Sequence, residues 1–331
     1  MAQNPPAQIP PAENTLEVDE VDADSAYNES IGTAGYVSSL SSSVRNYKYE
    51  NGRRYHAYHE GACVLPNDEE EQDRIDLLHH IYRLMLGGEL FLAPIGKNPQ
   101  RVLDLGTGTG IWAIQFADEY PSAQVIGTDL SPIQPAWVPP NCVFEIDDFE
   151  TEWLYTTKFD FIHGRELEGC VADEDRLFAQ AFKHLKSGGY FEFSGSYTYW
   201  FSDDDTAKKA ESCQFLVKNI HLAGDKFGKS FDTVPLWKEK MEKAGFVDVK
   251  EFVFKKPVGS WSKDPKMKEI GRFQLVQQLQ AVESYTPALF SRVLGWTKME
   301  IEVLIAKVRN ELKDHSLHLY VPVYFVYGRK P

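Results

Sequence analysis

The residues whose types and spacing best suit chemistry form one short segment, Asp104-Leu105-Gly106-Thr107-Gly108-Thr109-Gly110. Its glycines allow a sharp turn of the main chain and a close approach of a ligand to the backbone. The spacing GxGxG differs from the GxGxxG of phosphate-binding dinucleotide loops. The acid directly before the loop, Asp104, would repel a pyrophosphate but suits a ligand that carries an ammonium group. The segment therefore predicts a binding loop for a ligand other than NAD or FAD.

Further acids follow the next strand-like segments. Asp129 stands 19 residues after Gly110, where a carboxylate can accept both hydroxyls of a ribose. Asp147 and Asp148 come later, with Phe149 beside them, in position to read the edge of an adenine. Each acid taken singly is more often a helix cap or a turn residue. Together they match an amine, a ribose and a base without a basic phosphate clamp, which is the inventory of S-adenosylmethionine, whose sulfonium also favours aromatic faces.

A methyl group bound to a sulfonium is already activated, so the protein chiefly aligns donor and acceptor and excludes water. A base is needed only where the acceptor must lose a proton. The candidates are His163, Glu168, His56 and Tyr55. His163 is favoured because it is expected at a strand end on the ligand side and titrates near neutral pH. The alternative for His163 is a buried histidine satisfied by the main chain.

Residues 45–60 alternate tyrosines with basic side chains, a composition too polar for core and too aromatic for an ordinary linker. We expect them to form a flap over the ligand. Its aromatic walls would come from Tyr47, Tyr55 and Tyr58, and Arg53 or Arg54 would meet the methionine carboxylate. The alternative is a surface segment whose tyrosines pack on the sheet.

An aromatic cluster is expected at the same edge of the sheet. Tyr197, Tyr199 and Trp200 follow the strand-like segment 190–195 and could wall an apolar pocket for the methyl acceptor. Ordinary core beneath the later helices is an equal alternative. No metal site is expected, because the four cysteines are far apart and form no CxxC pair. That spacing also favours a reducing compartment.

From about residue 100, strand-like and helix-like segments alternate. The expected strands are 101–105, 124–129, 142–146, 159–164, 190–195, 247–256 and 318–330. Helices are expected at 110–119 and at 173–185, the second closed by Ser187-Gly188-Gly189. This alternation predicts an α/β fold with a doubly wound, mostly parallel sheet and helices on both faces.

The chain divides into five expected parts. They are a disordered acidic tail (1–44), a flap and helix (45–97), a cofactor-binding core (98–256), a helical cap (257–316) and a final core strand (317–331). The helix before the core should start after Pro66-Asn67-Asp68 and stop at Gly87-Gly88. The cap should hold helices at 264–282 and 287–313.

The composition of the chain limits the classes of partner that it is expected to bind. The chain has 331 residues and a net charge of −14, so phosphate backbones and anionic lipid would repel its surface. Nucleic acid and membrane partners are therefore not expected. Without a run of 18 apolar residues, a membrane span is not expected either. These features suit a cytoplasmic protein that acts on a small molecule.

A resemblance adds to this interpretation. The stretch VLDLGTGTGIWAIQFADEYPSAQVIGTDLSPIQP, followed by FDFIHGREL and LKSGGYFEF, resembles class I S-adenosylmethionine-dependent methyltransferases. With YKYENGRRYHAYHEG and LPNDEEEQDRIDLLHH, residues 45–255 resemble the LaeA-like methyltransferases of filamentous fungi. This family implies a Rossmann-like sheet of seven strands, the last antiparallel, and a setting in fungal secondary metabolism.

The resemblance also implies roles for individual residues. His163, Gly164 and Arg165 match the family's segment that faces cofactor and substrate. The expected cofactor-binding residues are Asp104, Gly106, Thr107, Gly108, Gly110, Asp129, Leu130, Asp147, Asp148, Phe149, His163, Tyr55 and Arg53. The expected catalytic residues are His163, Arg165 and Glu168, and the expected substrate-binding residues are Tyr47, Tyr58, Tyr197, Tyr199 and Trp200.

Three functions stay open at this point. The first is methylation of an O, N or C atom of a small fungal metabolite. The second is a nuclear regulator that works beside velvet-type proteins, as some family members do; the acidic tail suits it, but no basic import cluster is visible. The third is a cofactor-bound fold with non-methylating chemistry such as a cyclisation.

Overall fold

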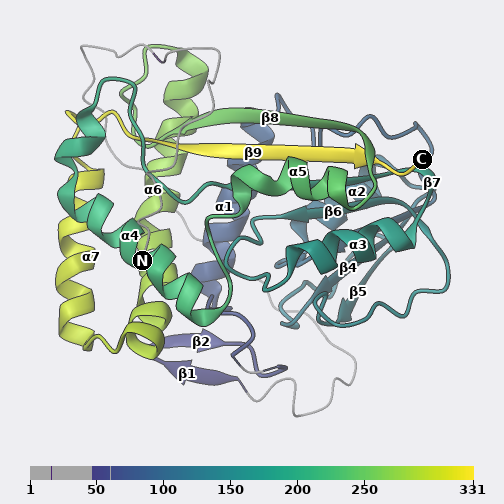
Figure 1. The fold of residues 1–331 in the computed structure, drawn as a ribbon, viewed down its shortest axis with the longest axis horizontal. Coiled ribbons are helices and arrows are strands. Elements are labelled where there is room, and N and C mark those ends of the chain that lie inside the picture. The colour runs from purple at the N-terminus through teal and green to yellow at the C-terminus, as the bar shows by residue number, and fades with distance from the viewer. Residues whose placement is uncertain (1–15, 17–46, 60) are drawn as a thin grey trace.

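The computed structural model describes residues 16, 47–59 and 61–331, so the predicted tail lies outside the described residues apart from Leu16. Within them, seven strands form one sheet in the order β5-β4-β3-β6-β7-β9-β8 (Figure 1). They are β3 (Arg101–Leu105), β4 (Gln124–Asp129), β5 (Cys142–Ile146), β6 (Phe159–Arg165), β7 (Leu185–Ser196), β8 (Val247–Pro257) and β9 (Tyr320–Arg329). Among these strands, β9 runs antiparallel to both of its neighbours, β7 and β8, and all other neighbouring pairs are parallel. The predicted mostly parallel sheet of seven strands is confirmed.

Helices cover both faces of the sheet, as its central strands require, because these are apolar on both sides. Figure 1 shows α3 (Glu174–His184) and α5 (Trp237–Lys243) in front, where Phe178 and Trp237 are fully buried. Behind lie α1 (Glu69–Met85) and α2 (Ile111–Glu119). The side chain of Asp68 caps α1 by accepting from the Glu71 N–H at 3.0 Å. This cap explains why the helix starts where the sequence predicts.

Further helices gather at the end of the sheet where β9 begins and the parallel strands end (Figure 1). They are α4 (Glu211–Phe227), α6 (Pro265–Ala288), the π-helix η3 (Leu289–Leu294) and α7 (Lys298–Leu312). Their apolar faces share one buried cluster, which includes Leu216, Val282 and Val308. We call α4, α6, η3 and α7 the cap. Helix α4 was not predicted separately and lies within the segment expected to be core.

Shorter elements complete the described fold. The hairpin β1 (Lys48–Glu50) and β2 (Arg53–Tyr55) forms a separate two-stranded sheet beside the cap. Two 3-10 turns, η1 (Thr206–Lys209) and η2 (Val234–Leu236), precede α4 and α5. No helix in the described part of the chain is long and apolar enough to cross a bilayer.

Two boundaries differ from the prediction. The segment 187–189 does not close α3 but lies inside β7, because Leu185 already pairs with Phe159 of β6. A Cβ on Gly189 would lie 2.9 Å from the Asp160 carbonyl oxygen, so the glycine permits a close strand approach. The predicted break at 283–286 is also absent, since α6 runs through Pro287 into η3.

The position of α6 depends on one glycine. A Cβ on Gly271 would lie 2.0 Å from the Gly259 carbonyl oxygen, and the Gly259 N–H donates to the Gly271 carbonyl at 2.9 Å. Alanine in place of a helical glycine normally stabilises by about 1 kcal/mol. Here we expect Gly271→Ala to destabilise by about 1–3 kcal/mol, the scale of an overpacked core.

The measurement is the urea midpoint of unfolding for the full chain. Gly96→Ala is the matched control, because no atom lies within 4 Å of a Cβ at that exposed position. A midpoint for Gly271→Ala at or above the wild-type value would contradict the close packing of α6.

Candidate functional site

A cavity opens at the carboxyl ends of β3, β4 and β6, where the strand order reverses between β3 and β6. Open α/β sheets bind ligands at such a point. Its floor and sides come from the last residues of these strands and the turns after them, including Gly106, Asp129 and Arg165. Its roof comes from residues near the hairpin, from α1 and from Tyr285 of α6. We call this the strand-end cavity.

The glycine loop forms the floor. Gly106, Thr107 and Gly108 line the cavity. Gly106 has φ +60°, and a Cβ there would lie 2.4 Å from Leu167 Cδ2. Gly110 stands behind the cavity as the N-cap of α2 at φ +82°, where a Cβ would meet Phe144 at 2.3 Å. Only glycine fits these left-handed positions without strain.

Asp104 lies beneath the loop rather than in the cavity. Its carboxylate accepts from Thr107 Oγ1 at 2.6 Å and from His163 Nδ1 at 2.7 Å. The acid therefore ties the loop to β6. Since the side chain is 3% exposed and both oxygens are used, a direct contact with a ligand ammonium group is not part of this geometry.

His163 lines neither this cavity nor the second one described below. Its ring stacks on Trp112 with centroids 3.8 Å apart and an interplanar angle of 4°. Burial lowers the pKa of His163, so its imidazole is neutral at pH 7 and donates to Asp104. The structure thus places His163 as a buried histidine, the alternative weighed above, with Asp104 as its partner instead of the main chain.

Asp129 does face the strand-end cavity, together with Leu130. Its Oδ2 accepts from the Gly108 N–H and its Oδ1 from the Ser131 N–H, both at 2.9 Å. Burial raises the pKa of Asp129 to about 6 despite these hydrogen bonds. A ligand hydroxyl that donates to this carboxylate would favour its charged form.

Of the three residues that follow β5, only Phe149 lines the strand-end cavity. Asp147 and Asp148 lie outside it and make different contacts. Asp148 Oδ2 contacts His59 Nδ1 at 2.7 Å, and Asp147 Oδ1 accepts from the Asp148 N–H at 2.9 Å. Asp148 therefore fastens the segment after the hairpin to the end of β5.

The predicted flap side chains do not line either cavity. Tyr47 lies under Arg54, and Tyr58 stacks on His59 with centroids 4.2 Å apart. Tyr55 is 2% exposed and packs in the cap cluster. The period of a strand explains this: Arg53 and Tyr55 point to the same side of β2, toward the cap. His56, the next residue, is the one that lines the strand-end cavity.

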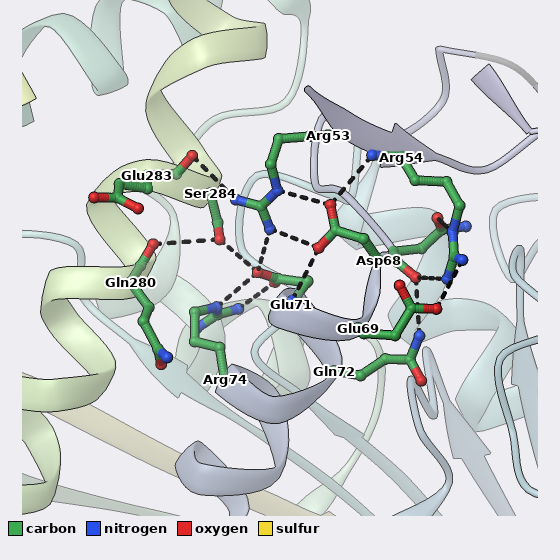
Figure 2. Close-up of polar contacts among 11 residues, drawn as sticks. Arg53, Arg54, Asp68, Glu69, Glu71, Gln72, Arg74, Gln280, Glu283 and Ser284 are labelled. Carbon is green, nitrogen blue, oxygen red and sulfur yellow. Dashed lines mark hydrogen bonds and ion pairs between the residues drawn. The ribbon is translucent and has the colours of Figure 1, made fainter. Parts of the chain in front are cut away.

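Figure 2 shows where Arg53 is bound instead. Its Nε and Nη2 donate to the Asp68 carboxylate at 2.7 and 2.9 Å, and Nη2 lies 3.9 Å from Glu71 Oε2. Glu71 is 3% exposed and also pairs with Arg74 at 2.9 and 2.6 Å and accepts from Ser284 Oγ at 2.5 Å. The network joins the hairpin, α1 and α6.

Arg74 is the guanidinium that the sequence interpretation missed. It lines the strand-end cavity, is 2% exposed, and its Nη1 has no hydrogen-bond partner within the described part of the chain. The only signal in the sequence is the i, i+3 spacing of Glu71 and Arg74, which many exposed helices share. Arg165 also lines this cavity and donates to His79 Nδ1 at 2.9 Å.

A second cavity lies between the sheet end and the cap, and we call it the cap cavity. Its lining includes Glu168, Tyr199 and Trp200, with apolar residues of α4 and α6. Glu166 and Tyr285 line both cavities, so the two spaces adjoin. Tyr197 is 4% exposed and lies in the sheet's buried cluster instead.

Two cysteines meet at the strand-end cavity although they are 107 positions apart. The sulfur atoms of Cys63 and Cys170 are 2.9 Å apart, and both residues line the cavity. The hydrogen bond from Cys170 lowers the pKa of the Cys63 thiol to about 7. Among the described residues, no group of three His, Cys, Asp or Glu side chains is arranged to hold a metal ion.

The fold and the cavity at the glycine loop are those of a methyltransferase domain. Residues 77–251 match the family described as "Methyltransferase domain", and the chain belongs to this family. It is 41% identical over 313 residues to "Methyltransferase pytC" of Aspergillus terreus, which covers 94% of this chain and 96% of that protein.

Two further relatives have different descriptions. "Secondary metabolism regulator laeA" of Aspergillus flavus is 32% identical over 313 residues, or 92% of this chain and 83% of that protein. "Probable methyltransferase tdiE" of Emericella nidulans is 33% identical over 261 residues, or 79% and 82%. The resemblance to LaeA-like fungal methyltransferases is confirmed.

The buried Glu71 network yields a stability prediction. Glu71→Gln removes the charge that pairs with the buried Arg74, so it should destabilise the protein by about 3–5 kcal/mol, as for a broken buried ion pair. Glu69→Gln is the matched control two residues earlier, because the Glu69 side chain is 81% exposed beside Arg54. Glu69→Gln should lower the free energy of unfolding by about 0–1 kcal/mol. Chemical unfolding of both variants gives the comparison, and equal losses would show that burial of Glu71 is unimportant.

Proposed function

We propose that this methyltransferase binds S-adenosylmethionine in the strand-end cavity and methylates a small, mostly apolar molecule held in the cap cavity. The observation that carries the proposal is the junction of the two cavities at Glu166 and Tyr285. Donor and acceptor can meet there behind the cap. Such positioning can supply about 7–11 kcal/mol of rate enhancement in favourable cases.

The residues of the strand-end cavity fit the cofactor. Asp129 would accept from the ribose hydroxyls, and Phe149 would contact the adenine ring. Arg74 would donate its unpartnered Nη1 to the methionine carboxylate, in the role that the sequence suggested for Arg53. When bound, the cofactor supplies a methyl group already activated for displacement. The protein aligns the acceptor and keeps water out.

The cap favours an enzyme that methylates a metabolite over a regulator that works through partner proteins. A regulator that works through partner proteins needs no enclosed acceptor cavity, whereas α4 and α6 build one with apolar walls from Leu216, Ile220 and Val282. Several relatives carry the name of a secondary metabolism regulator, so this second role is the alternative, with a nuclear instead of the predicted cytoplasmic location. A cyclisation in the same cavity is the third possibility.

The experiment that tests the function starts from metabolite profiles with and without the gene. The precursor that accumulates is incubated with purified protein and labelled S-adenosylmethionine. Label in the product supports methyl transfer. Conversion of the precursor without label would instead indicate non-methylating chemistry. Loss of products without an accumulating precursor, together with altered transcripts of biosynthetic genes, would favour the regulator.

Asp129→Asn tests the cofactor assignment separately. Loss of hydrogen bonds to a charged carboxylate should weaken binding of S-adenosylhomocysteine by about 1–3 kcal/mol at pH 7.5. The difference from wild type should shrink below pH 6, because burial raises the pKa of Asp129 to about 6 and the protonated acid then resembles the amide.

Isothermal titration calorimetry at pH 5.5 and 7.5 measures both effects. Asp118→Asn, an exposed change on α2, is the matched control and should leave the affinity unchanged. An unaltered affinity in Asp129→Asn would remove Asp129 from the ribose site.

A further inference from the structure

The cap cavity contains buried polar atoms without partners. Glu168 Oε2, Trp200 Nε1, Gln274 Oε1 and Gln277 Oε1 make no hydrogen bond within the described part of the chain. All four residues line the cavity and are between 1% and 5% exposed. Leaving such an atom unpaired in a buried site is unfavourable, because its lost hydration is not replaced. Several of them around one apolar cavity indicate a ligand that pairs with them.

Three of the four atoms are acceptors, so the ligand must bring donors. The amide of Gln274 is oriented by its Nε2, which donates to Gln278 Oε1 at 2.8 Å. Its Oε1 is therefore the free atom. Gln277 lies one position before Gln278 on the same helix. The wall formed by α6 thus offers carbonyl oxygens to a hydroxyl or N–H group.

At the inner end of the cap cavity, Glu166 and Glu168 lie in the same environment. Glu166 has φ +56°, a strained conformation for a non-glycine residue of the kind found at functional sites. Its carboxylate accepts from Ser196 Oγ at 2.7 Å and from the Tyr82 hydroxyl. Lys256 Nζ donates to the same Ser196 Oγ at 3.0 Å. The Glu166 carboxylate is therefore held in place by Ser196 and Tyr82 and can position neighbouring groups in the cavity.

Glu168 is the freer member of the pair. Its Oε1 accepts weakly from the Ser196 N–H at 3.3 Å, and its Oε2 is unpartnered. A Cβ on Gly195 would lie 2.5 Å from that Oε2, so the glycine leaves room for the carboxyl group. Burial and the charge of Glu166 raise the pKa of Glu168 well above its usual value.

The pKa values of Glu166 and Glu168 are shifted in opposite directions. Although burial opposes ionisation, the charge of Lys256 and the hydrogen bonds from Tyr82 and Ser196 hold the pKa of Glu166 below its usual value. Of the two carboxylates, Glu168 therefore takes up a proton more readily, and Glu166 stays ionised more readily.

Charge excludes two classes of acceptor. Both the Glu166 carboxylate and the Lys256 ammonium group line this end of the cap cavity, so a carboxylate and an ammonium group would each meet a like charge there. The Lys256 side chain is buried, so its repulsion of a second cation is only weakly screened. An uncharged donor group meets neither penalty.

We propose, on the basis of the proposed function, that the methyl acceptor is the hydroxyl oxygen of an uncharged, largely apolar molecule. That hydroxyl donates to Glu168 Oε2, and a second donor group of the molecule reaches Gln274 or Gln277. The step forms a carbon–oxygen bond on the acceptor and breaks the donor's carbon–sulfur bond, whose electron pair stays on sulfur. The hydroxyl proton passes to the pair Glu166–Glu168 and from there to solvent.

The test measures binding rather than turnover. The full chain is saturated with S-adenosylhomocysteine and titrated by calorimetry with 2-naphthol, 2-naphthoate and 2-naphthylmethylammonium, which share one apolar body. We expect 2-naphthol to bind at least tenfold more tightly than either ion. We expect 2,7-dihydroxynaphthalene to bind more tightly still, because it brings a second donor. Equal or tighter binding of an ion, or no binding of the naphthols, would overturn the proposal.

Variants locate the contacts. Glu168→Leu should weaken 2-naphthol binding at least tenfold, and Gln277→Leu should reduce the advantage of the diol. Glu269→Gln, an exposed change on α6, is the control and should have no effect. Affinity for S-adenosylhomocysteine reports whether each variant is folded. Naphthol affinities that are unchanged in both leucine variants would refute the assigned contacts.

The two proposals can fail independently. If the wild-type chain does not bind S-adenosylhomocysteine, the proposed function is wrong. If it binds S-adenosylhomocysteine but shows no preference for the uncharged hydroxyl, only the acceptor class is wrong.

Discussion

The buried carboxylate of Glu71 is the contact on which the arrangement of the site depends. A charge taken out of water must be paired and hydrogen-bonded, since its desolvation otherwise costs several kcal/mol. Glu71 meets this need with Arg74 of its own helix, Arg53 of the hairpin and Ser284 of α6 (Figure 2). These partners come from three separate segments, so satisfying one carboxylate brings the hairpin, α1 and the cap together over the strand-end cavity.

The acids at the strand ends show how environment assigns roles to one residue type. Asp104 has both oxygens occupied by Thr107 and His163 and so orders the loop from below. Asp129 binds two backbone N–H groups yet still faces the cavity, where a ligand can reach it. Asp148 is occupied by His59. All lie in or just after the carboxyl ends of strands of one sheet, but only the contacts made in three dimensions separate the ligand-facing acid from the structural ones.

The cap cavity illustrates a conflict between stability and chemistry. A folded chain normally pairs its buried polar atoms and avoids left-handed backbone at residues with a side chain. Glu166, Glu168 and Gln277 depart from these rules within one cavity. Such departures persist only where the surrounding packing enforces them. Here the packing comes from α6 against β8 and from α4 against the other cap elements η3 and α7.

The sequence by itself determined the seven strands of the sheet, the helices that alternate with its first strands and the ligand edge, because period-2 and period-3.6 patterns and the glycine loop are local signals. It therefore also located Asp129 and Phe149, since parallel strands end at one edge of a sheet. It did not determine the helix α4. Only the tertiary structure decided that Arg74 instead of Arg53 reaches the cavity, that Cys63 meets Cys170, and that Glu166 joins two cavities. These outcomes depend on how segments far apart in the chain pack, and no local pattern encodes that packing.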